Sequence, residues 1–462
     1  MIKQNMFFLL LYCFFLSSLF SEDNVSSALK SAGWGGLADE LAITFNDESY
    51  KNYLKINKSI VSMETNVPLQ GKTAKISLPV KSPEWQTGLE FFEGNLKPGT
   101  EYVLLFDHCW LEGSVPYTSL KELDWRGWGI GTNSVCSELG VFLVNSKGKE
   151  TKRICALYCH DHNLGIPQPM HPFFFSTPQD ANSTIVFKVR KKANIAIGGI
   201  ALMTAELYWE KTNETVQSYK GGPPANASWT PITALTDEFD GGKIDVKKWN
   251  IKTGGYPPTY MDPKNVQVKD GKLYCKIQEK DFTKDPDLKK LPNAWFWSFT
   301  TGDMTSREPM FHGYFEVKAK LADCPAASCC WFQDKETGTE IDLVETDGRK
   351  KEGGSAIHYF PVPGNNYVPH QTVGEGYINN KPLCDDFHIY SLEWDEKEIK
   401  LYFDGRLYER FKNIHCHTPQ TLHIGIGFSI AQPKTDADYQ KFPCAMVVDY
   451  VRAWKKCPGV KE

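Results

Sequence analysis

The sequence predicts an all-β protein built from two β-sandwich domains in tandem. Three observations support this prediction. Short runs of alternating apolar and polar residues recur along the chain, clusters of Gly, Pro, Asn and Lys separate them, and one Gly- and Pro-rich stretch divides the runs into two sets. Runs of this kind are typical of antiparallel sandwiches. A chain of 462 residues is long enough for two or three domains.

The first segment, residues 1–21, is expected to be a signal peptide. It contains a lysine, an apolar run from Met6 to Leu16 and small residues around Ser21, in the order that secretory signals have. The alternative is an uncleaved anchor, but the apolar run is shorter than the roughly 20 residues that span a bilayer. We therefore expect a secreted, extracellular protein without membrane contact after cleavage.

Residues 22–215 form the first predicted sandwich. The runs EYVLLFDHCW, LGVFLV, STIVFKV and ALMTAELYWEK have strand character, and a helix is expected only around SSALKSAGWGGLADEL. The stretch VQSYKGGPPANASWTP then interrupts the alternation, which predicts a linker at residues 216–230. Strand-like runs resume in residues 231–457 and form a larger sandwich, in which Asp404-Gly405 predicts a tight hairpin turn.

The composition argues against nucleic acid as a partner and does not define the pairing of the cysteines. A formal charge of −4 gives no basic surplus, so sequence-independent nucleic-acid binding is not expected. Loss of the signal peptide would remove Cys13 from the 13 cysteines and leave twelve. An even number in an exported chain permits disulfides, but spacing does not define the pairing.

Three carboxylates occupy one predicted strand, GTEIDLVETD, residues 338–347. Alternation places Glu340 and Asp342 on one face, and Glu345 joins them only if a β-bulge lies between Asp342 and Glu345. The alternative is a solvated strand face, because 56 acidic residues yield this spacing about once by chance. The apolar residues between the acids favour a buried strand, where unused carboxylates are costly.

Three acids on one face have the chemistry of glycoside hydrolysis. Retaining glycosidases hold two carboxyls about 5–5.5 Å apart, one as nucleophile and one as acid. An aspartate between two glutamates helps to separate their pKa values. Aromatic residues that could stack on sugar rings lie nearby: NAWFWSF puts Trp295 and Trp297 on one expected strand face, and CCWF supplies Trp331. Core packing is the alternative for each tryptophan.

A second polar face is predicted in HGYFEVKAK, where alternation places Glu316 and Lys318 on the same side. This wet face is a candidate cleft floor, so both residues are candidate substrate-binding residues.

The motif E-x-D-x-x-E, here Glu340, Asp342 and Glu345, resembles that of glycoside hydrolase family 16, the agarase, porphyranase, carrageenase and laminarinase group. Four more segments resemble the family in the same order: DEFDGGKIDVKKWN, MTSREPMFHGYFEVKAKL, FHIYSLEWDEKEIKLYFDGRLY and VVDYVRAWK. The resemblance covers roughly residues 235–456 and implies a concanavalin-like β-jelly-roll and a retaining endo-acting mechanism without a required cofactor. It makes Glu340 the nucleophile, Asp342 its assisting carboxylate and Glu345 the general acid/base.

The resemblance also bears on the substrate. ADCPAASCCWFQDKETGTEIDLVE lacks the longer Trp-Pro insertion of laminarinases, which favours a β-linked galactan. His358 resembles a cleft histidine of galactan-cleaving members. A β-1,3(4)-glucan is the alternative, because CCWF and HIGIGFSI depart from the usual patterns, and a non-catalytic carbohydrate-binding protein is a third possibility.

The resemblance leads to two further expectations: cationic side chains that contact sulfate groups of the substrate, and a structural calcium ion. Sulfate esters favour Arg or Lys at a cleft; the candidates are Arg307, Lys318 and Arg349. Calcium needs oxygen ligands; the candidates are Asp237, Glu238 and Asp449. For each of these residues a solvated surface charge is the alternative.

The N-terminal sandwich resembles, by architecture only, the modules that bind carbohydrate beside such enzymes. Its candidate platform residues are Trp110, Tyr117, Trp125 and Trp128, with core packing as the alternative. The cluster CHDH, residues 159–162, lacks the partner pair of a zinc site. We expect a monomer with a polysaccharide as its partner.

Overall fold

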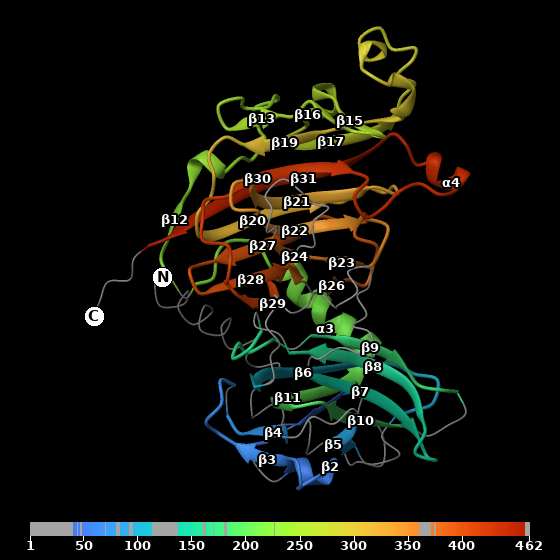
Figure 1. Ribbon diagram of the computed structural model, residues 1–462, viewed down its shortest axis with the longest axis vertical. Coiled ribbons are helices and arrows are strands. Elements are labelled where there is room, and N and C mark those ends of the chain that lie inside the picture. The colour runs from blue at the N-terminus through green and yellow to red at the C-terminus, as the bar shows by residue number, and fades with distance from the viewer. Residues whose placement is uncertain are drawn as a thin grey trace, which may run out of the picture. The chain divides into compact units, whose positions relative to one another are not determined.

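The computed structural model describes residues 40–43, 45–46, 49–69, 71–79, 84–91, 96–112, 137–159, 163–169, 171–179, 183–225, 227–359, 371–373 and 376–457. The expected signal peptide, residues 26–39 of the helix expected at the start, Tyr117, Trp125, Trp128 and residues 160–162 lie outside these ranges. The last two residues of that expected helix, Glu40 and Leu41, belong instead to strand β1 (Glu40–Ile43). The chain divides into two compact units between Gln217 and Ser218 (Figure 1). Each unit is a β-sandwich, which confirms the all-β prediction. No helix in the described ranges combines the length and apolarity of a membrane span.

Two antiparallel sheets form the N-terminal unit. The first has the order β3-β4-β11-β6-β9, with β1 also paired to β11. Its strands are β1 (Glu40–Ile43), β3 (Val61–Glu64), β4 (Thr73–Leu78), β6 (Glu101–Glu112), β9 (Phe173–Ser176) and β11 (Ala193–Thr204). The second has the order β2-β5-β10-β7-β8. Its strands are β2 (Leu54–Ile56), β5 (Gln86–Phe91), β7 (Glu138–Asn145), β8 (Glu150–Tyr158) and β10 (Ser183–Arg190).

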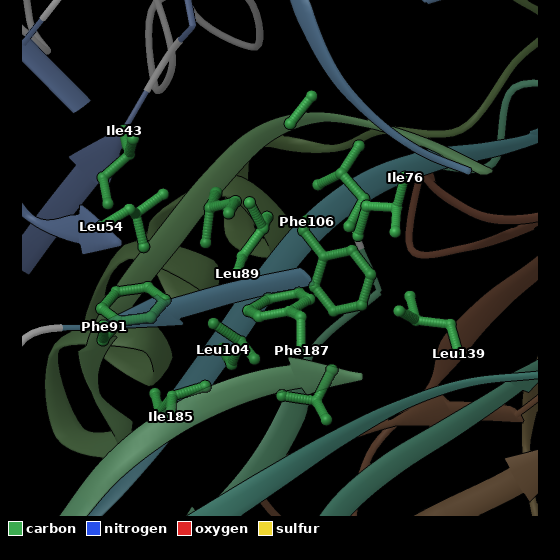
Figure 2. Close-up of a cluster of buried hydrophobic side chains, with 14 of the residues drawn as sticks. Ile43, Leu54, Ile76, Leu89, Phe91, Leu104, Phe106, Leu139, Ile185 and Phe187 are labelled. Carbon is green, nitrogen blue, oxygen red and sulfur yellow. The ribbon is translucent and has the colours of Figure 1, made fainter. Parts of the chain in front are cut away.

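The core of this unit lies between the two sheets and is rich in aromatic rings (Figure 2). Phe187 of β10 is fully buried and packs at 6.5 Å from Phe91 and edge-on at 5.2 Å from Phe106, measured between ring centroids. Trp110 is also fully buried in this cluster, so it is a core residue and not part of an exposed platform.

The run ALMTAELYWEK, expected to be a strand, is a strand only as far as Thr204. Helix α3 (Ala205–Ser218) follows directly, and the Thr204 hydroxyl accepts the N–H of Leu207 at 3.4 Å. The outward face of the first sheet is itself apolar, and α3 covers it through Tyr208 and Trp209. The strand expectation was wrong here because alternation over a few residues also fits an amphipathic helix that packs on a sheet.

The C-terminal unit has a large sheet of order β14-β15-β18-β17-β31-β20-β27-β28-β29, to which β12 and β16 add; we call it the outer sheet. Its strands are β12 (Trp229–Pro231), β14 (Gly254–Tyr256), β15 (Thr259–Met261), β16 (Val266–Lys269), β17 (Lys272–Glu279), β18 (Phe299–Thr301), β20 (Gly313–Lys320), β27 (His388–Trp394), β28 (Glu398–Phe403), β29 (Arg406–Lys412) and β31 (Cys444–Lys456).

A seven-stranded sheet packs against it, with the order β13-β19-β30-β21-β22-β24-β25; we call it the inner sheet. Its strands are β13 (Trp249–Ile251), β19 (Asp303–Ser306), β21 (Ala327–Asp334), β22 (Thr339–Asp347), β24 (Ala356–Tyr359), β25 (Gln371–Val373) and β30 (Thr421–Gly427). A small pair, β23 (Glu352–Gly354) and β26 (Gly376–Ile378), completes the strands. The 3-10 turns of the two units and a short helix are η1 (Ser49–Asn52), η3 (Thr233–Leu235), η4 (Pro263–Asn265), η5 (Leu288–Lys290), η6 (Ala294–Phe296) and α4 (Asp436–Tyr439).

Many strands that are neighbours in these two sheets are far apart in sequence, as in a jelly roll. Strand β31 pairs with β12, β17 and β20. The predicted hairpin is present: Asp404 and Gly405 adopt φ of 48° and 76° between β28 and β29, as the type I′ turn requires.

The segment expected to be a linker begins at the boundary between the units and then packs on β20. The N–H of Gly222 donates to Glu316 Oε2 at 2.7 Å, and the hydroxyls of Tyr219 and Tyr314 are 3.2 Å apart. Residues 219–222 are therefore held by side chains of the C-terminal unit.

We predict that Phe187→Ala destabilises the N-terminal unit by about 3–5 kcal/mol, because it removes a buried ring and leaves a cavity. Urea unfolding followed by a probe in this unit measures the loss. The exposed Lys58→Ala is the control and is expected to change stability by less than about 0.5 kcal/mol. Equal effects of both changes would contradict the packing described.

Candidate active site

The three acids of β22 lie on one face because the strand contains a bulge. Trp331 of β21 pairs with Asp342, but its neighbour Cys330 pairs with Val344, so Leu343 has no partner on β21. The extra residue reverses the alternation, as one inserted residue must. The bulge predicted between Asp342 and Glu345 is thus confirmed, and it brings Glu345 to the side of Glu340.

This face points away from the core. The ring of Phe332 packs edge-on at 5.0 Å from Phe315 of the outer sheet, so even-numbered residues of β21 fill the space between the sheets. Its odd-numbered residues Cys329, Trp331 and Gln333 therefore face outward, and they pair with Glu345, Asp342 and Glu340. We call this outward surface of the inner sheet the acid face.

Hydrogen bonds hold two of the acids. His358, which lies opposite Glu340 on β24, places Nε2 2.9 Å from Asp342 Oδ2. The amide of Gln333 donates to Glu340 Oε2. One ligand atom each from Glu340, Asp342 and His358 lies within 4.8 Å of the others, the one three-member donor group of this kind among the described residues. Such a group can share protons or hold a cation. Glycoside hydrolysis by two carboxyls requires only the protons.

Burial and mutual repulsion raise the pKa values of both glutamates. Burial raises the pKa of Glu340 to about 8, and the Asp342 charge adds to this. Burial also raises the pKa of Glu345, again with a contribution from Asp342. Burial by itself lowers the pKa of His358, but the bond to Asp342 and the charges of the three acids outweigh it and raise the pKa overall. The cluster therefore retains protons near neutral pH.

The electrostatics and the family resemblance differ over where the proton lies. Burial favours a protonated Glu340, whereas the resemblance makes Glu340 the nucleophile, which must be ionised. The Gln333 amide and a protonated His358 act the other way and lower the pKa of Glu340. These two neighbours favour the anion, but burial outweighs them, so the ionised form that a nucleophile needs is the minor form of Glu340 near neutral pH.

Aromatic and charged residues extend the acid face across the inner sheet. Trp331 stacks on His423 of β30 with 4.5 Å between ring centroids. A row of cross-strand neighbours runs from Glu345 through Cys329 and Gly425 to Asp303. The N–H of Lys252 donates to the Asp303 carbonyl at 2.9 Å, which continues the row to the end of β13.

Asp303 has room on this face because residue 425 is glycine. A Cβ at Gly425 would lie 2.5 Å from Asp303 Oδ2. Burial raises the pKa of Asp303 to about 7, while the charges of Lys252 and Lys335 lower it. Burial and the same two lysines lower the pKa of His423 to about 3. In the described part of the chain, Lys252 has no carboxylate within 4.0 Å of its ammonium group.

The sequence reasoning missed Gln333, His423, Asp303 and Lys252. Alternation places Gln333 on the acid face once β21 is known to pair with β22. The other three come from strands far apart in sequence, and only the register of the sheet brings them together. No local pattern marks them.

Two predicted substrate-binding residues lie elsewhere. Glu316 and Lys318 are on β20, where Phe315 faces the core, so they point to the opposite surface of the sandwich from the acids. Glu316 is fully buried, and Lys318 pairs with Asp449 at 2.9 Å. The expectation that they form a cleft floor with the acids was wrong, since alternation identifies a polar face but not the sheet to which it belongs.

The other candidate cations are also engaged. Arg307 donates through Nε to the Val246 carbonyl at 2.6 Å. Arg349 bonds to Asp347 and Asp438, each at 2.7 Å. Among the described residues, neither guanidinium has a hydrogen bond or ion pair with the three acids, so neither is placed in the site.

Trp295 and Trp297 do not share a strand face, because Trp295 lies in the 3-10 turn η6. Trp297 stacks on Phe282 at 6.0 Å and meets Tyr260 edge-on at 5.5 Å, so it anchors this loop. Trp295 is 72% exposed. Trp331 is thus the predicted tryptophan that lies beside the acids.

The three candidate calcium ligands do not form one set. Asp237 accepts the indole N–H of Trp249 at 2.7 Å, Glu238 pairs with Arg452 at 2.7 Å, and Asp449 pairs with Lys318. Glu238 and Asp449 line a pocket of about 550 Å³ on the outer sheet together with Lys272 and Arg452. Since cations and an indole occupy these carboxylates, the proposed joint calcium ligation was wrong.

A β-sandwich with two glutamates and an aspartate on the outward face of one sheet has the groups that glycoside hydrolases use. Residues 229–456 match the family model described as beta-porphyranase A-D, GH16 domain. The C-terminal unit therefore belongs to glycoside hydrolase family 16, as the motif predicted.

Relatives of this unit include enzymes named for galactans and for glucans. Beta-porphyranase E of Zobellia galactanivorans is 28% identical in an alignment that covers 44% of this chain and 78% of that relative. Beta-agarase of Phocaeicola plebeius is 29% identical, over 42% of this chain and 66% of that relative. Glucan endo-1,3-beta-glucosidase A1 of Niallia circulans is 26% identical over 48% of this chain, and the match spans only 37% of its length.

Solved structures similar to the chain include two galactan-associated enzymes. The kappa-carrageenase from Pseudoalteromonas carrageenovora in complex with an oligotetrasaccharide aligns with a TM-score of 0.43 and 21% identity, over 52% of this chain and 100% of that one. Porphyranase B from Zobellia galactanivorans aligns with a TM-score of 0.42 and 20% identity, over 52% and 97%.

We predict that Glu340→Gln makes the C-terminal unit less sensitive to pH. The folded pKa of Glu340 lies above its ordinary 4.5, so folding favours the protonated form and wild-type stability falls as pH rises from about 4.5 to about 8. One such proton contributes at most about 1.4 kcal/mol per pH unit. Urea unfolding at several pH values within this window measures the slope. Exposed Glu336→Gln is the control, and equal slopes for wild type and Glu340→Gln would contradict the prediction.

Proposed function

We propose that the protein is an endo-acting, retaining glycoside hydrolase that cleaves a β-linked galactan. The observation that carries this proposal is the bulge at Leu343, which places both glutamates and Asp342 on the acid face. Membership of glycoside hydrolase family 16 supports the hydrolytic class. The row of polar and aromatic side chains that crosses several strands of the acid face supports a polymeric sugar as the substrate.

In the proposed reaction Glu340 attacks the anomeric carbon while Glu345 gives its proton to the leaving glycosidic oxygen. A covalent glycosyl-enzyme ester forms and the bond to the leaving sugar breaks. Glu345, now ionised, takes a proton from water, and the resulting hydroxide equivalent displaces Glu340. Two inversions leave the anomeric configuration unchanged, and both carboxyls return to their starting states.

Asp342 and His358 serve as positioning residues in this scheme. Asp342 lies between the two glutamates and shares a proton with His358 across 2.9 Å. When Glu340 loses its charge to the ester, the repulsion it exerts on Glu345 disappears, which helps Glu345 to change from acid to base. The Gln333 amide holds the attacking carboxylate in place.

The family model and several relatives named for galactans favour galactan as the substrate. The glucanase among the relatives keeps a β-1,3-glucan as the second candidate. The acid face adds one argument for an anionic galactan, because Lys252 lies in the row of Glu345. Four strand spacings separate these residues, about 19 Å, so Lys252 is placed to meet a sulfate ester on a sugar several units from the cleaved bond.

Two parts of the proposal concern the rest of the chain. We propose export, on the order of charged, apolar and small residues in 1–21. We also propose that the N-terminal sandwich binds carbohydrate, a proposal that rests on its architecture and on its position next to a glycosidase domain. Because Trp110 is buried, any platform must use other residues of that unit.

The first test compares reducing-sugar release by wild type and Glu340→Gln on agarose, porphyran, κ-carrageenan and laminarin. We expect wild type to cut one galactan and the variant to lose at least about 10³-fold in kcat, since the nucleophile is absent. The exposed Glu336→Gln should retain full activity. Cleavage of laminarin alone would replace galactan by glucan, and binding without cleavage would favour a non-catalytic role.

Azide distinguishes the roles of the two glutamates. In Glu340→Ala, azide can occupy the space of the missing nucleophile and give a glycosyl azide of inverted configuration. In Glu345→Ala, azide attacks the covalent intermediate and gives a product of retained configuration. NMR of the products measures the configuration. The opposite pattern would exchange the two assignments, as the burial of Glu340 alone favours.

The placement of Lys252 predicts a loss of activity that depends on whether the substrate is sulfated. Lys252→Gln should lower kcat/KM about 10-fold or more on a sulfated galactan and leave an unsulfated one nearly unchanged, because only the charged substituent loses its partner. Lys284→Gln is the control, since Lys284 is an exposed lysine that pairs with Asp281. A similar loss on both polymers would show a structural role for Lys252 instead.

A further inference from the structure

Cys324 and Cys444 come together where the two sheets of the C-terminal unit are connected. Cys324 lies between β20 of the outer sheet and β21 of the inner sheet, and Cys444 begins β31. Strands β20 and β31 are antiparallel neighbours, and Lys320 pairs with Val447 at the end of β20. Continued for three residues, this register sets Asp323 opposite Cys444 and Cys324 one step further.

Side-chain contacts show that the two segments stay together beyond the last ladder pair. Lys441 Nζ lies 2.8 Å from Asp323 Oδ2. The thiols of Cys324 and Cys444 lie within interaction distance of each other, and the Cys444 thiol also lies beside the backbone of Asp323. Directly opposite residues of antiparallel strands have Cα atoms about 4.5–5.5 Å apart. A displacement of one residue, about 3.4 Å along the strand, gives about 6 Å for Cys324 and Cys444, within the range of about 4.4–6.8 Å that a disulfide needs.

We propose that Cys324 and Cys444 form a disulfide in the mature protein. The linkage joins the connection between the sheets to the central strand of the outer sheet. It does not depend on the catalytic proposal, because neither sulfur belongs to the acid face. It agrees with the expected export of the chain to an oxidising compartment, where such bonds persist.

The two thiols differ in a way that suits stepwise oxidation. Cys324 is fully buried, whereas Cys444 is partly exposed. The interaction with the Cys324 thiol is the main cause that lowers the pKa of Cys444, so Cys444 is the better nucleophile of the two. An external protein disulfide, as carried by thiol oxidoreductases, is the chemical class of oxidant required.

The disulfide forms in two thiol–disulfide exchange steps, and electrons are conserved in each. The Cys444 thiolate attacks one sulfur of the oxidant's disulfide and releases the other sulfur as a thiolate. Cys324 then loses its proton and attacks Cys444 Sγ, which releases the second sulfur of the oxidant. Two cysteine thiols have lost two protons and two electrons, and the oxidant has become a dithiol.

The linkage would restrain the segment that leads into the strands of the acid face. Residues 321–326 lead directly into β21, which carries Trp331 and Gln333. The charges of Asp347 and Arg349, at the end of β22, act on Cys324. Cross-linking this point to β31 therefore restrains both strands that hold the acid face.

A third thiol, Cys384, is the local competitor. The charge of Asp323 acts on its pKa, so it lies in the same neighbourhood. Its sulfur is 3.9 Å from Asp385 Oδ1. It has no hydrogen bond to Cys324 or Cys444 within the described residues, and it provides the matched control.

The test uses the full chain exported through an oxidising compartment, alkylated and digested without reductant, and examined by mass spectrometry. We expect a peptide pair that joins Cys324 to Cys444 and persists in Cys384→Ser. Recovery of Cys324 and Cys444 as alkylated thiols would overturn the proposal, and so would a linkage of either to Cys384. This readout uses wild type, so it does not require a variant that folds.

Thermal unfolding provides an independent measurement. Reduction should lower the Tm of the wild-type C-terminal unit by roughly 5–10 °C, because the linkage closes a long loop of the unfolded chain. The double variant Cys324→Ser/Cys444→Ser should show no change on reduction, while Cys384→Ser should behave as wild type. An equal shift in the double variant would assign the effect to other cysteines and contradict the proposal.

Discussion

The candidate site depends on one residue that has no cross-strand partner. Without the extra residue at Leu343, strict alternation would point Glu345 into the core between the sheets, where a carboxylate is costly. With it, Glu345 joins Glu340 and Asp342 on the acid face. The bulge thus turns an ordinary pairing of β21 and β22 into a surface with three acids, and every proposed chemical role follows from that geometry.

The same clustering acts against stability. Glu340 and Glu345 are partly removed from water and repel Asp342, and the protein offsets this cost only in part through Gln333 and His358. Residues chosen for stability alone would not bring these charges together. The raised pKa of Glu340 is a measure of that cost, and the raised pKa of Glu345 helps that glutamate to hold the proton that it gives to the leaving oxygen in the proposed reaction.

Local patterns in the sequence predicted the elements whose causes are local. Alternation and the Asp404-Gly405 turn identified strands and a hairpin, and the apolar residues around the acids identified a buried strand. The bulge was inferred as the condition for Glu345 to join the other two acids. Alternation failed where it was ambiguous, as at α3, where few residues distinguish a strand from a helix that packs on a sheet. It also failed for Trp295, because the 3-10 turn depends on contacts of Trp297 with Tyr260 and Phe282.

Relations between distant strands were not accessible in this way. Glu316 and Lys318 have the pattern of a cleft face, yet they lie on the far surface, and Lys252 and Asp303 have no local mark although they lie in the row of Glu345. Which strands are neighbours is set by the packing of the whole sandwich. The motif could therefore identify the three acids, but not the side chains that surround them.

Strand β31 has a consequence for the order of events during synthesis. It occupies the interior of the outer sheet, between β17 and β20, and also pairs with β12 from the start of the unit. The sheet cannot close until residues 444–456 have left the ribosome, and contacts between such distant segments form slowly. A chain that cannot fold early remains extended while it is being made, which is the state that the proposed export through a narrow translocation channel would require.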